Sequence, residues 1–408
     1  MVDQTTVSKL RLAYARRRID AFLAQIDQLR ASSFPHKDFE LALDGLEEFA
    51  RNEAANLDLP PNFDAEVIDK ACFQIMEVVE RHTHFLGFIL RSTNVRNAFE
   101  LHDPLRALIR KVIGDQARVL ISAEWNFIPF TYPRNIDSLP NFVLIGTPAT
   151  DAGNMLVAPL AGHEIGHSIW TRHDFAEALE QRIRKETSQV LEADEARTRR
   201  LLEEFGMNDL GISIVQDTCA KRALRQLEEI ASDLLGLQIF GASYLYAYEY
   251  LLAPSGYPQD LNYPSERKRL HIMQEQSEAL GIEVDGEVYE RWKEKPVDPK
   301  RRDMFSVVNE IVDACMMPLR AKLTKVTNEL SLDAPMDADI DPVLSAFENG
   351  VPFSGEASLG AIATAGWNYT RKRSGLAGDD QEKERRLVND LMLKTIEVNE
   401  YNYRIADA

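Results

Sequence analysis

Residues 161–170 read AGHEIGHSIW. Within them His163, Glu164 and His167 form the pattern H-E-x-x-H. The two histidines are four residues apart, so on a helix they lie on one face about one turn apart. Two imidazoles so placed can bind one metal ion, and burying three ionisable groups without such a partner would be costly. The stretch therefore predicts a helix that carries a metal site.

The sequence around this motif favours a helix. Residues 154–170 are mostly apolar apart from the motif, as a buried helix would be. Asp151 or Asn154 is a candidate for the N-terminal cap. Proline fits best in the first turn of a helix, so Pro159 predicts that the helix begins near Val157 or bends there.

Two glycines lie inside the predicted helix, at Gly162 and Gly166. Glycine is a poor helix former, so its presence there needs a reason. A small residue in a buried helix lets a neighbouring element approach closely. We therefore expect a strand or a second helix to pack tightly against this part of the chain.

A catalytic zinc ion has three protein ligands and one open position, so a third ligand is expected. His173 has the spacing of the last histidine in the metzincin pattern H-E-x-x-H-x-x-G-x-x-H. Trp170 stands where that pattern has glycine, which makes the required turn hard to form. His173 is therefore kept as a rival ligand only.

An acidic pair further along the chain is the better candidate. Glu229 and Asp233 lie four residues apart on a probable helix and share a face. Glu229 can bind the metal while Asp233 accepts a hydrogen bond from a ligand histidine, which orients the imidazole. Glu228 is the competing carboxylate, but Glu229 is preferred because it has an aspartate four residues on.

With these residues the chain resembles the gluzincins, zinc metallopeptidases that pair H-E-x-x-H with a glutamate on a second helix. The segment 229–233 fits their second motif, E-x-x-S/A-D. The resemblance implies a Zn²⁺ site with His163, His167 and Glu229 as ligands. It also implies Glu164 as the general base and Asp233 as the carboxylate behind a ligand histidine.

A further stretch, residues 263–270, resembles the element H-P-x-x-x-x-R-I of the gluzincin group that contains the CAAX-prenyl and heat-shock proteases. Tyr263 replaces the histidine of that element. The match marks Arg269 as a partner of the site, and Arg269, His271 or Tyr263 as a group that stabilises an oxyanion. Arg267 is a rival for that role. The chain departs from those proteases because its apolar runs are too short to span a bilayer.

The composition narrows the class of protein. The formal net charge of −18 makes a nucleic acid an improbable partner, because nucleic-acid binders present basic surfaces. Cys72, Cys219 and Cys315 are far apart and odd in number, which fits a reducing cytoplasm without a disulfide framework. The N-terminal residues lack the charged head and apolar run of a signal peptide, so a cytoplasmic location is expected.

The pattern along the chain predicts a mainly α protein with a small β-sheet, an α+β fold. A helical N-terminal region is expected over residues 1–115, and a second helical region over residues 296–408. Between them, residues 116–295 are expected to form a zincin-like catalytic core. A helical insertion over residues 174–211 interrupts this core, and its first part, 174–205, reads as one long exposed helix.

Two short runs before the motif have β character, at residues 119–122 and 141–147. In zincins such a strand forms the edge of a small sheet beside the motif helix. An extended peptide can add to that edge through backbone hydrogen bonds. The segment 141–152 is the candidate for this role.

These features predict a zinc-dependent peptidase that acts on a peptide or protein, with Glu164 taking a proton from a metal-activated water. One alternative is a zinc hydrolase of a non-peptide amide or ester. The other is a non-catalytic zincin-fold protein with a binding or regulatory role. The intact Glu164 argues against this last alternative, since a structural metal site has no use for a base.

Overall fold

The computed structural model describes residues 4–58, 63–92, 98–124, 130–131, 138–204, 206, 211–252, 260–284, 286–290, 297–373 and 379–406. Most of these residues lie in helices, and three short strands form one sheet. The expected mainly α fold with a small sheet is therefore confirmed. No helix in the described part of the chain has the length and apolar character that a bilayer crossing requires.

The chain forms two compact units, Met1–Arg110 with Gly114–Gly153, and Lys111–Ile113 with Asn154–Ala408. The elements of the first are α1 (Gln4–Arg30), α2 (Lys37–Ala55), α3 (Ala65–Ser92), most of α4 (Ala98–Ile113), β1 (Arg118–Glu124), β2 (Phe130–Thr131) and β3 (Phe142–Pro148). The second holds the motif residues. The division expected at residues 115 and 295 stays a prediction.

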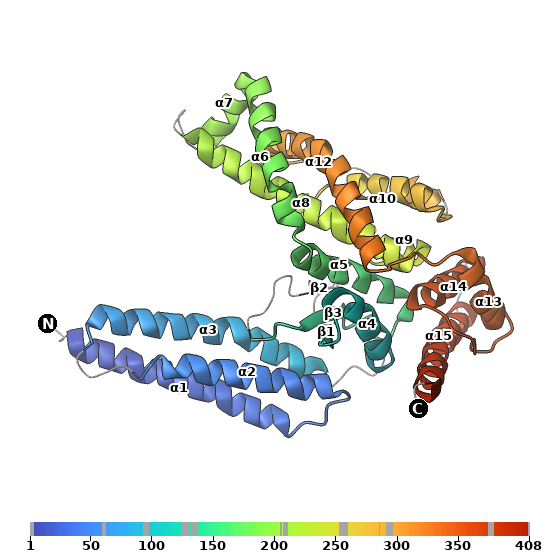
Figure 1. Cartoon of the computed structure of the whole chain (residues 1–408), viewed down its shortest axis with the longest axis horizontal. Helices are drawn as coiled ribbons and strands as arrows, with labels where there is room; N and C mark the ends of the chain where they lie inside the picture. Colours follow the sequence, from blue (N-terminus) through green and yellow to red (C-terminus); the bar gives the residue numbers. More distant parts are fainter. Residues whose placement is uncertain are drawn as a thin grey trace. The chain divides into compact units, whose positions relative to one another are not determined.

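In the first unit, α1, α2 and α3 pack together along their lengths (Figure 1). Their apolar faces meet in one core cluster that also includes Leu120 of β1 and Leu144 of β3. Burying these side chains drives the bundle and the sheet together. The apolar periodicity predicts one long helix over residues 65–99. The structure describes α3 up to Ser92 and α4 from Ala98, and residues 93–97 lie outside the described part of the chain.

The sheet has the strand order β1-β3-β2. β1 and β3 are parallel, with Val119 opposite Val143 and Ile121 opposite Ile145. Four successive residues of each strand are buried, as expected when both faces of a parallel pair are covered. The two predicted strands are thus confirmed. The expectation that their edge receives a peptide beside the motif helix stays a prediction.

In its described part the second unit contains helices and loops and no strand. Its elements are η1 (Met155–Leu160), α5 (Ala161–Arg172), α6 (Phe175–Ala193), α7 (Glu195–Glu204), α8 (Ile212–Phe240), α9 (Ala242–Leu252), α10 (Glu266–Leu280), α11 (Glu287–Glu290), η3 (Pro299–Arg301), α12 (Arg302–Glu329), α13 (Asp337–Glu348), α14 (Leu359–Lys372) and α15 (Asp379–Ala406). Helix α8 packs against α5, α6, α10 and α12. Nearly every side chain from Leu227 onward in α8 is buried, so this is the central helix of the unit.

The motif helix α5 begins after a short 3-10 helix. Asn154 caps η1 by accepting a hydrogen bond from the Leu156 amide at 3.2 Å, which selects it over Asp151 as the cap. Pro159 lies in η1, and the α-helix begins two residues later at Ala161. The start expected near Val157 is therefore that of the 3-10 helix.

The C-terminal helices α14 and α15 hold η1, the 3-10 helix that precedes the motif helix α5, in place. The indole Nε1 of Trp367 on α14 donates to the Leu156 carbonyl at 2.8 Å. The Met155 amide donates to Asn389 Oδ1 on α15 at 2.8 Å. These hydrogen bonds join residues more than 200 positions apart and fix the backbone that leads into the histidine motif.

Helices α5 and α8 approach closely where both carry small residues. A Cβ atom placed on Gly166 would lie 2.6 Å from the Ser232 Cα, and one on Gly162 would lie 2.9 Å from the Gly236 Cα. Carbon atoms do not approach so closely without repulsion, so the two backbones can meet only because these positions lack side chains. The expected role of Gly162 and Gly166 is thus confirmed.

The insertion differs from its prediction. Residues 174–205 do not form one exposed helix, because the chain breaks at Asp194 between α6 and α7. Asp194 accepts a hydrogen bond from the Arg197 amide at 2.9 Å, which starts a new helix there. In addition, Phe175, Leu179 and Ile183 of α6 are buried, and α6 packs against α8 and α12. The insertion is therefore part of the core of this unit.

Replacing Gly166 by alanine tests the close packing of α5 and α8. The new methyl group would meet the backbone of Ser232, which cannot rotate away, so overpacking of about 1–3 kcal/mol is expected to exceed the gain of roughly 1 kcal/mol in helix propensity. We expect the thermal unfolding midpoint to fall by several degrees.

Gly87→Ala is the comparison variant, because its methyl group would meet the end of the Arg91 side chain, which pairs with Glu124 at 2.7 Å, and no backbone atom. Its midpoint should fall less than that of Gly166→Ala, because a side chain can shift where a helix backbone cannot. Equal midpoints for Gly166→Ala and the unsubstituted protein would contradict the account of the α5–α8 contact.

Candidate metal centre

The three predicted ligands come together in the second unit. His163 Nε2 lies 3.2 Å from His167 Nε2 and 3.3 Å from Glu229 Oε2. His167 Nε2 lies 3.9 Å from Glu229 Oε1. One ligand atom from each residue lies within 4.8 Å of the other two, and these residues form the metal-capable group within the described chain.

Each histidine is held from behind by a carboxylate. His163 Nδ1 lies 3.0 Å from Asp233 Oδ1, and His167 Nδ1 lies 2.9 Å from Glu228 Oε1. A carboxylate accepts a hydrogen bond from a protonated Nδ1, and in this tautomer Nε2 carries the free lone pair. Both Nε2 atoms then face each other and an anionic glutamate, so three electron donors converge on one point.

Such a convergence fits a metal ion. Zinc binds nitrogen and oxygen at about 2.0–2.2 Å, which places tetrahedral ligand atoms roughly 3.3 Å apart. The contacts of 3.2 Å and 3.3 Å at His163 match this spacing. Two imidazoles and one carboxylate also form the donor set of catalytic zinc sites with an open fourth position.

In the absence of a metal ion, protonation of His163 supplies the positive charge in the cluster. Burial alone would lower the pKa of His163, but hydrogen bonds and charges from Asp233 and Glu229 outweigh it and raise this pKa to about 10. Burial alone would raise the pKa of Glu229, but His163 and further cations lower it to about 2. The cluster therefore attracts positive charge strongly.

Asp233 is the centre of the hydrogen bonds behind His163. The guanidinium of Arg269 on α10 donates to both Asp233 oxygens at 2.6 Å, and the Tyr244 hydroxyl of α9 donates to Oδ1 at 2.8 Å. Arg269 also lies over the Tyr248 ring, 5.2 Å from its centroid. Burial alone would raise the pKa of Asp233, but Arg269 and His163 keep it well below its ordinary value. Asp233 thus stays ionised and fixes His163.

Glu164 occupies the first turn of α5, directly after His163 and three residues before His167. Residues three apart on a helix are neighbours on its surface, so Glu164 lies next to His167 along α5. Its side chain is buried. The role of this carboxylate as a general base stays a prediction.

His173 and His271 are not brought to the cluster. His173 is the C-terminal cap residue of α5, and α6 begins directly beyond Asp174. Trp170, which stands where the metzincin pattern has glycine, stacks on Phe175 in the core with ring centroids 5.2 Å apart. The His271 ring is 69% exposed and pairs with Glu275 at 3.3 Å.

Arg269 and His271 have different surroundings because of the geometry of the helix. Arg269 and His271 lie two residues apart on α10, which places them about 200° apart around the helix axis. Arg269 therefore faces α8, while His271 faces solvent. The structure thus places His271 away from the cluster, and its assignment as a catalytic residue stays a prediction. Arg269 is a partner of the site, as predicted, but its contact is with Asp233.

Two roles escaped prediction from the sequence. Glu228 is not a competing ligand, since its carboxylate holds His167. Arg225 contacts Glu228 at 2.9 Å and Glu229 at 2.8 Å, and its side chain is 32% exposed. It also hydrogen-bonds with Tyr263. The spacing of Arg225 three and four residues before these glutamates is a signal that could have identified it.

Comparison with protein-family models, with curated proteins and with solved structures finds no match for this chain. The chemistry of the cluster must therefore be inferred from the chain's own residues and their geometry.

Metal binding tests the cluster directly. We expect the protein to bind one Zn²⁺ per chain, because three donors converge on one point. Glu229→Gln should remove most of this affinity, and Glu228→Gln should lower it about 10–100-fold because His167 loses its orienting partner. Competition with a chromophoric chelator, together with elemental analysis, measures both effects.

Glu192→Gln provides the control, since this glutamate is exposed on α6. It should bind Zn²⁺ as the unsubstituted protein does. Full zinc binding by Glu229→Gln would show that the cluster is not the metal site.

The charged cluster also predicts how the stability of the metal-free protein depends on pH. The pKa of His163 rises from 6.5 to about 10, so its contribution is complete below pH 6.5 and is lost as the pH rises towards 10. Glu229, with a pKa lowered from 4.5 to about 2, contributes above pH 4.5 and loses this contribution as the pH falls towards 2. Between pH 6.5 and 10, with a chelator present, we expect the unfolding midpoint to fall more in the unsubstituted protein than in His163→Gln. Scanning fluorimetry measures the two slopes, and equal slopes would contradict the assignment.

Proposed function

We propose that this chain is a zinc-dependent peptidase of the gluzincin type, with His163, His167 and Glu229 as metal ligands. The observation that carries the proposal is the convergence of both Nε2 atoms and the Glu229 carboxylate, each imidazole being fixed by its own carboxylate. A structural zinc site is usually closed by four protein ligands, whereas a catalytic site keeps one position open. Three ligands with a neighbouring glutamate favour a catalytic site.

The chemistry divides between a bound cation and the protein. A divalent cation in this cluster would polarise a carbonyl group and lower the pKa of a water molecule. Glu164 would accept the proton of the attacking water and pass it to the leaving amine. Asp233 and Glu228 would keep the two imidazoles in the tautomer that presents Nε2.

A positive group facing the substrate would stabilise the negative oxygen that develops during attack. Arg269 is poorly placed for this, because its side chain is enclosed and donates to both oxygens of Asp233. Arg225 is the better candidate, since it contacts Glu229 and a third of its side chain is exposed. Tyr263, which hydrogen-bonds with Arg225, lies at the same edge of the site.

The proposed compartment is the cytoplasm. All three cysteines are free and buried, as expected for a chain that folds without disulfide bonds. Burial raises the pKa of each thiol, so none is activated as a nucleophile. The reaction is therefore assigned to the metal cluster.

Glu164→Gln tests the proposed function. The amide keeps the size of the side chain but cannot accept a proton, so hydrolysis should fall about 10²–10⁴-fold while zinc affinity changes little. Digestion of a peptide library by the zinc-loaded protein, read by mass spectrometry, measures the activity. Zinc titration of the same samples measures the binding.

The comparison also separates the alternatives. Glu180→Gln on the exposed face of α6 is the matched control and should cleave at the full rate. Cleavage of amide or ester compounds but of no peptide would favour the non-peptide hydrolase. A lack of any hydrolysis by the zinc-loaded protein would favour the binding or regulatory role and would overturn the proposal.

A further inference from the structure

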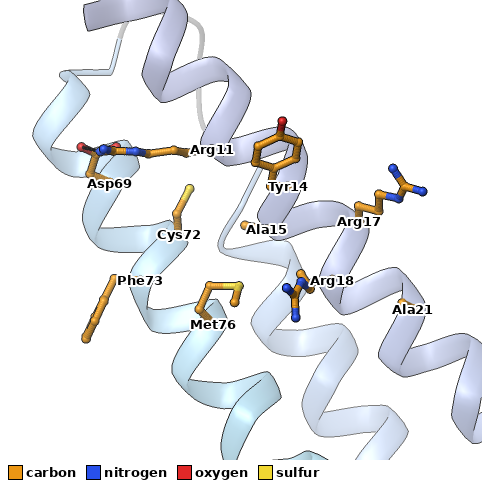
Figure 2. Close-up of a pocket in the computed structure, with 10 residues that line it drawn as sticks. All are labelled: Arg11, Tyr14, Ala15, Arg17, Arg18, Ala21, Asp69, Cys72, Phe73 and Met76. Carbon is orange, nitrogen blue, oxygen red and sulfur yellow. Dashed lines mark hydrogen bonds and ion pairs between the residues drawn. The ribbon is translucent and has the colours of Figure 1, made fainter.

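An open groove lies between α1 and α3 in the first unit, and none of the residues that line it belongs to the proposed chemistry (Figure 2). Its volume is about 830 Å³. Figure 2 shows Cys72 and Met76 of α3 pointing towards α1, with the Tyr14 ring and Arg18 on the α1 side. The groove thus runs along two helices of the bundle.

The groove exposes large apolar side chains that the core of the bundle does not use. Tyr14 is 57% exposed and Phe73 is 70% exposed, and Met76 lies one turn beyond Phe73 on α3. Leu10, one turn before Tyr14 on α1, is also exposed. The core side of α1 is already filled by its buried residues, so these side chains form a second apolar face. Such contiguous apolar patches are typical of interaction surfaces.

The charge on the groove is opposite to that of the whole chain. Its lining holds three basic side chains, Arg11, Arg17 and Arg18, and one acidic one, Asp69, whereas the chain has a net charge of −18. Arg11 pairs with Asp69 across the groove at 2.5 Å. Arg17 and Arg18 are exposed and form no ion pair with the described part of the chain. They are therefore available to a partner.

We propose that this groove binds an amphipathic helix of a partner protein, with apolar residues along one face and acidic residues beside them. Two flanking helices with apolar residues at helical spacing are the geometry in which a third helix docks. Arg17 and Arg18 would face the partner's carboxylates, and Tyr14, Phe73 and Met76 would contact its apolar face. The −18 charge of the chain makes this basic strip the favoured place for an acidic segment.

The shape of the surface favours a peptide over a membrane. A helix that lies on a lipid surface presents a convex apolar face. Here the apolar side chains line a hollow between α1 and α3, which a narrow segment can enter. The 27 residues of α1 span about 40 Å, enough to accommodate several turns of a partner helix.

A fluorescein-labelled peptide with leucine at helical spacing and glutamate elsewhere is the probe, read by fluorescence anisotropy with the full-length protein. The matched peptide has lysine in place of every glutamate. We expect the acidic peptide to bind saturably, at least tenfold more tightly than the basic one, and more weakly as the salt concentration rises.

The double variant Arg17→Glu, Arg18→Glu should weaken the acidic peptide about tenfold or more, since two exposed ion pairs become repulsive. Phe73→Ser should also weaken it, and this side chain is exposed enough to be replaced without loss of the fold. Arg199→Glu on α7 and Met317→Ser on α12 are controls with an exposed arginine and an exposed apolar side chain outside the groove. Both should bind as the unsubstituted protein does.

Three outcomes would overturn the proposal. The first is the absence of saturable binding of the acidic peptide up to about 1 mM, or equal binding by the groove variants. The second is a dimer in sedimentation experiments that dissociates in Phe73→Ser, which would make a second copy the occupant. The third is binding to phosphatidylserine vesicles, lost in the arginine variant, without peptide binding. None of these readouts depends on hydrolysis, so the result stands apart from the proposed function.

Discussion

The site depends on the contact between the backbones of α5 and α8. Gly162 and Gly166 face Gly236 and Ser232, and the absence of bulky side chains lets the two helices meet. The histidines of α5 then lie directly opposite the carboxylates of α8. Larger residues at these glycines would separate the helices and move the histidines of α5 away from the carboxylates of α8. The small residues therefore determine the distance between the donors.

The contact places an unusual amount of charge in the interior. His163, Asp233 and Arg269 form a chain of close hydrogen bonds, with Tyr244 as a further donor to Asp233. Burying such groups costs several kcal/mol of desolvation free energy for each ion. The attraction between opposite charges offsets this cost only when their geometry is good. A protein with apolar residues of similar size at these positions would often be as stable. We interpret the network as one that serves the chemistry of the cluster, because it fixes a tautomer rather than filling space.

The surrounding helices hold the contact in place from several directions. α14 and α15 fix the backbone of η1 before the motif helix, and α10 delivers Arg269 to α8. α6 and α12 cover α8 on further sides. The segments expected to be an insertion and a C-terminal region thus belong to the same compact unit as the histidine motif. The groove between α1 and α3 belongs to the other unit and offers a separate surface.

The sequence by itself determined the features that depend on short-range spacing. The periods of helix and strand identified the mainly α fold and both principal strands, and the four-residue spacings placed His163 with His167 and Glu229 with Asp233. Only the tertiary structure decided which partner each side chain meets. Glu228 and Glu229 are neighbours in sequence and point about 100° apart around α8. The packing of α5 decides that Glu228 holds His167 Nδ1 while Glu229 joins His163 and His167 in the metal-capable group. The same holds for His271, which points to solvent although Arg269 is buried. Periodicity defines the face of a helix, whereas the neighbour of that face is set by packing between residues far apart in the chain.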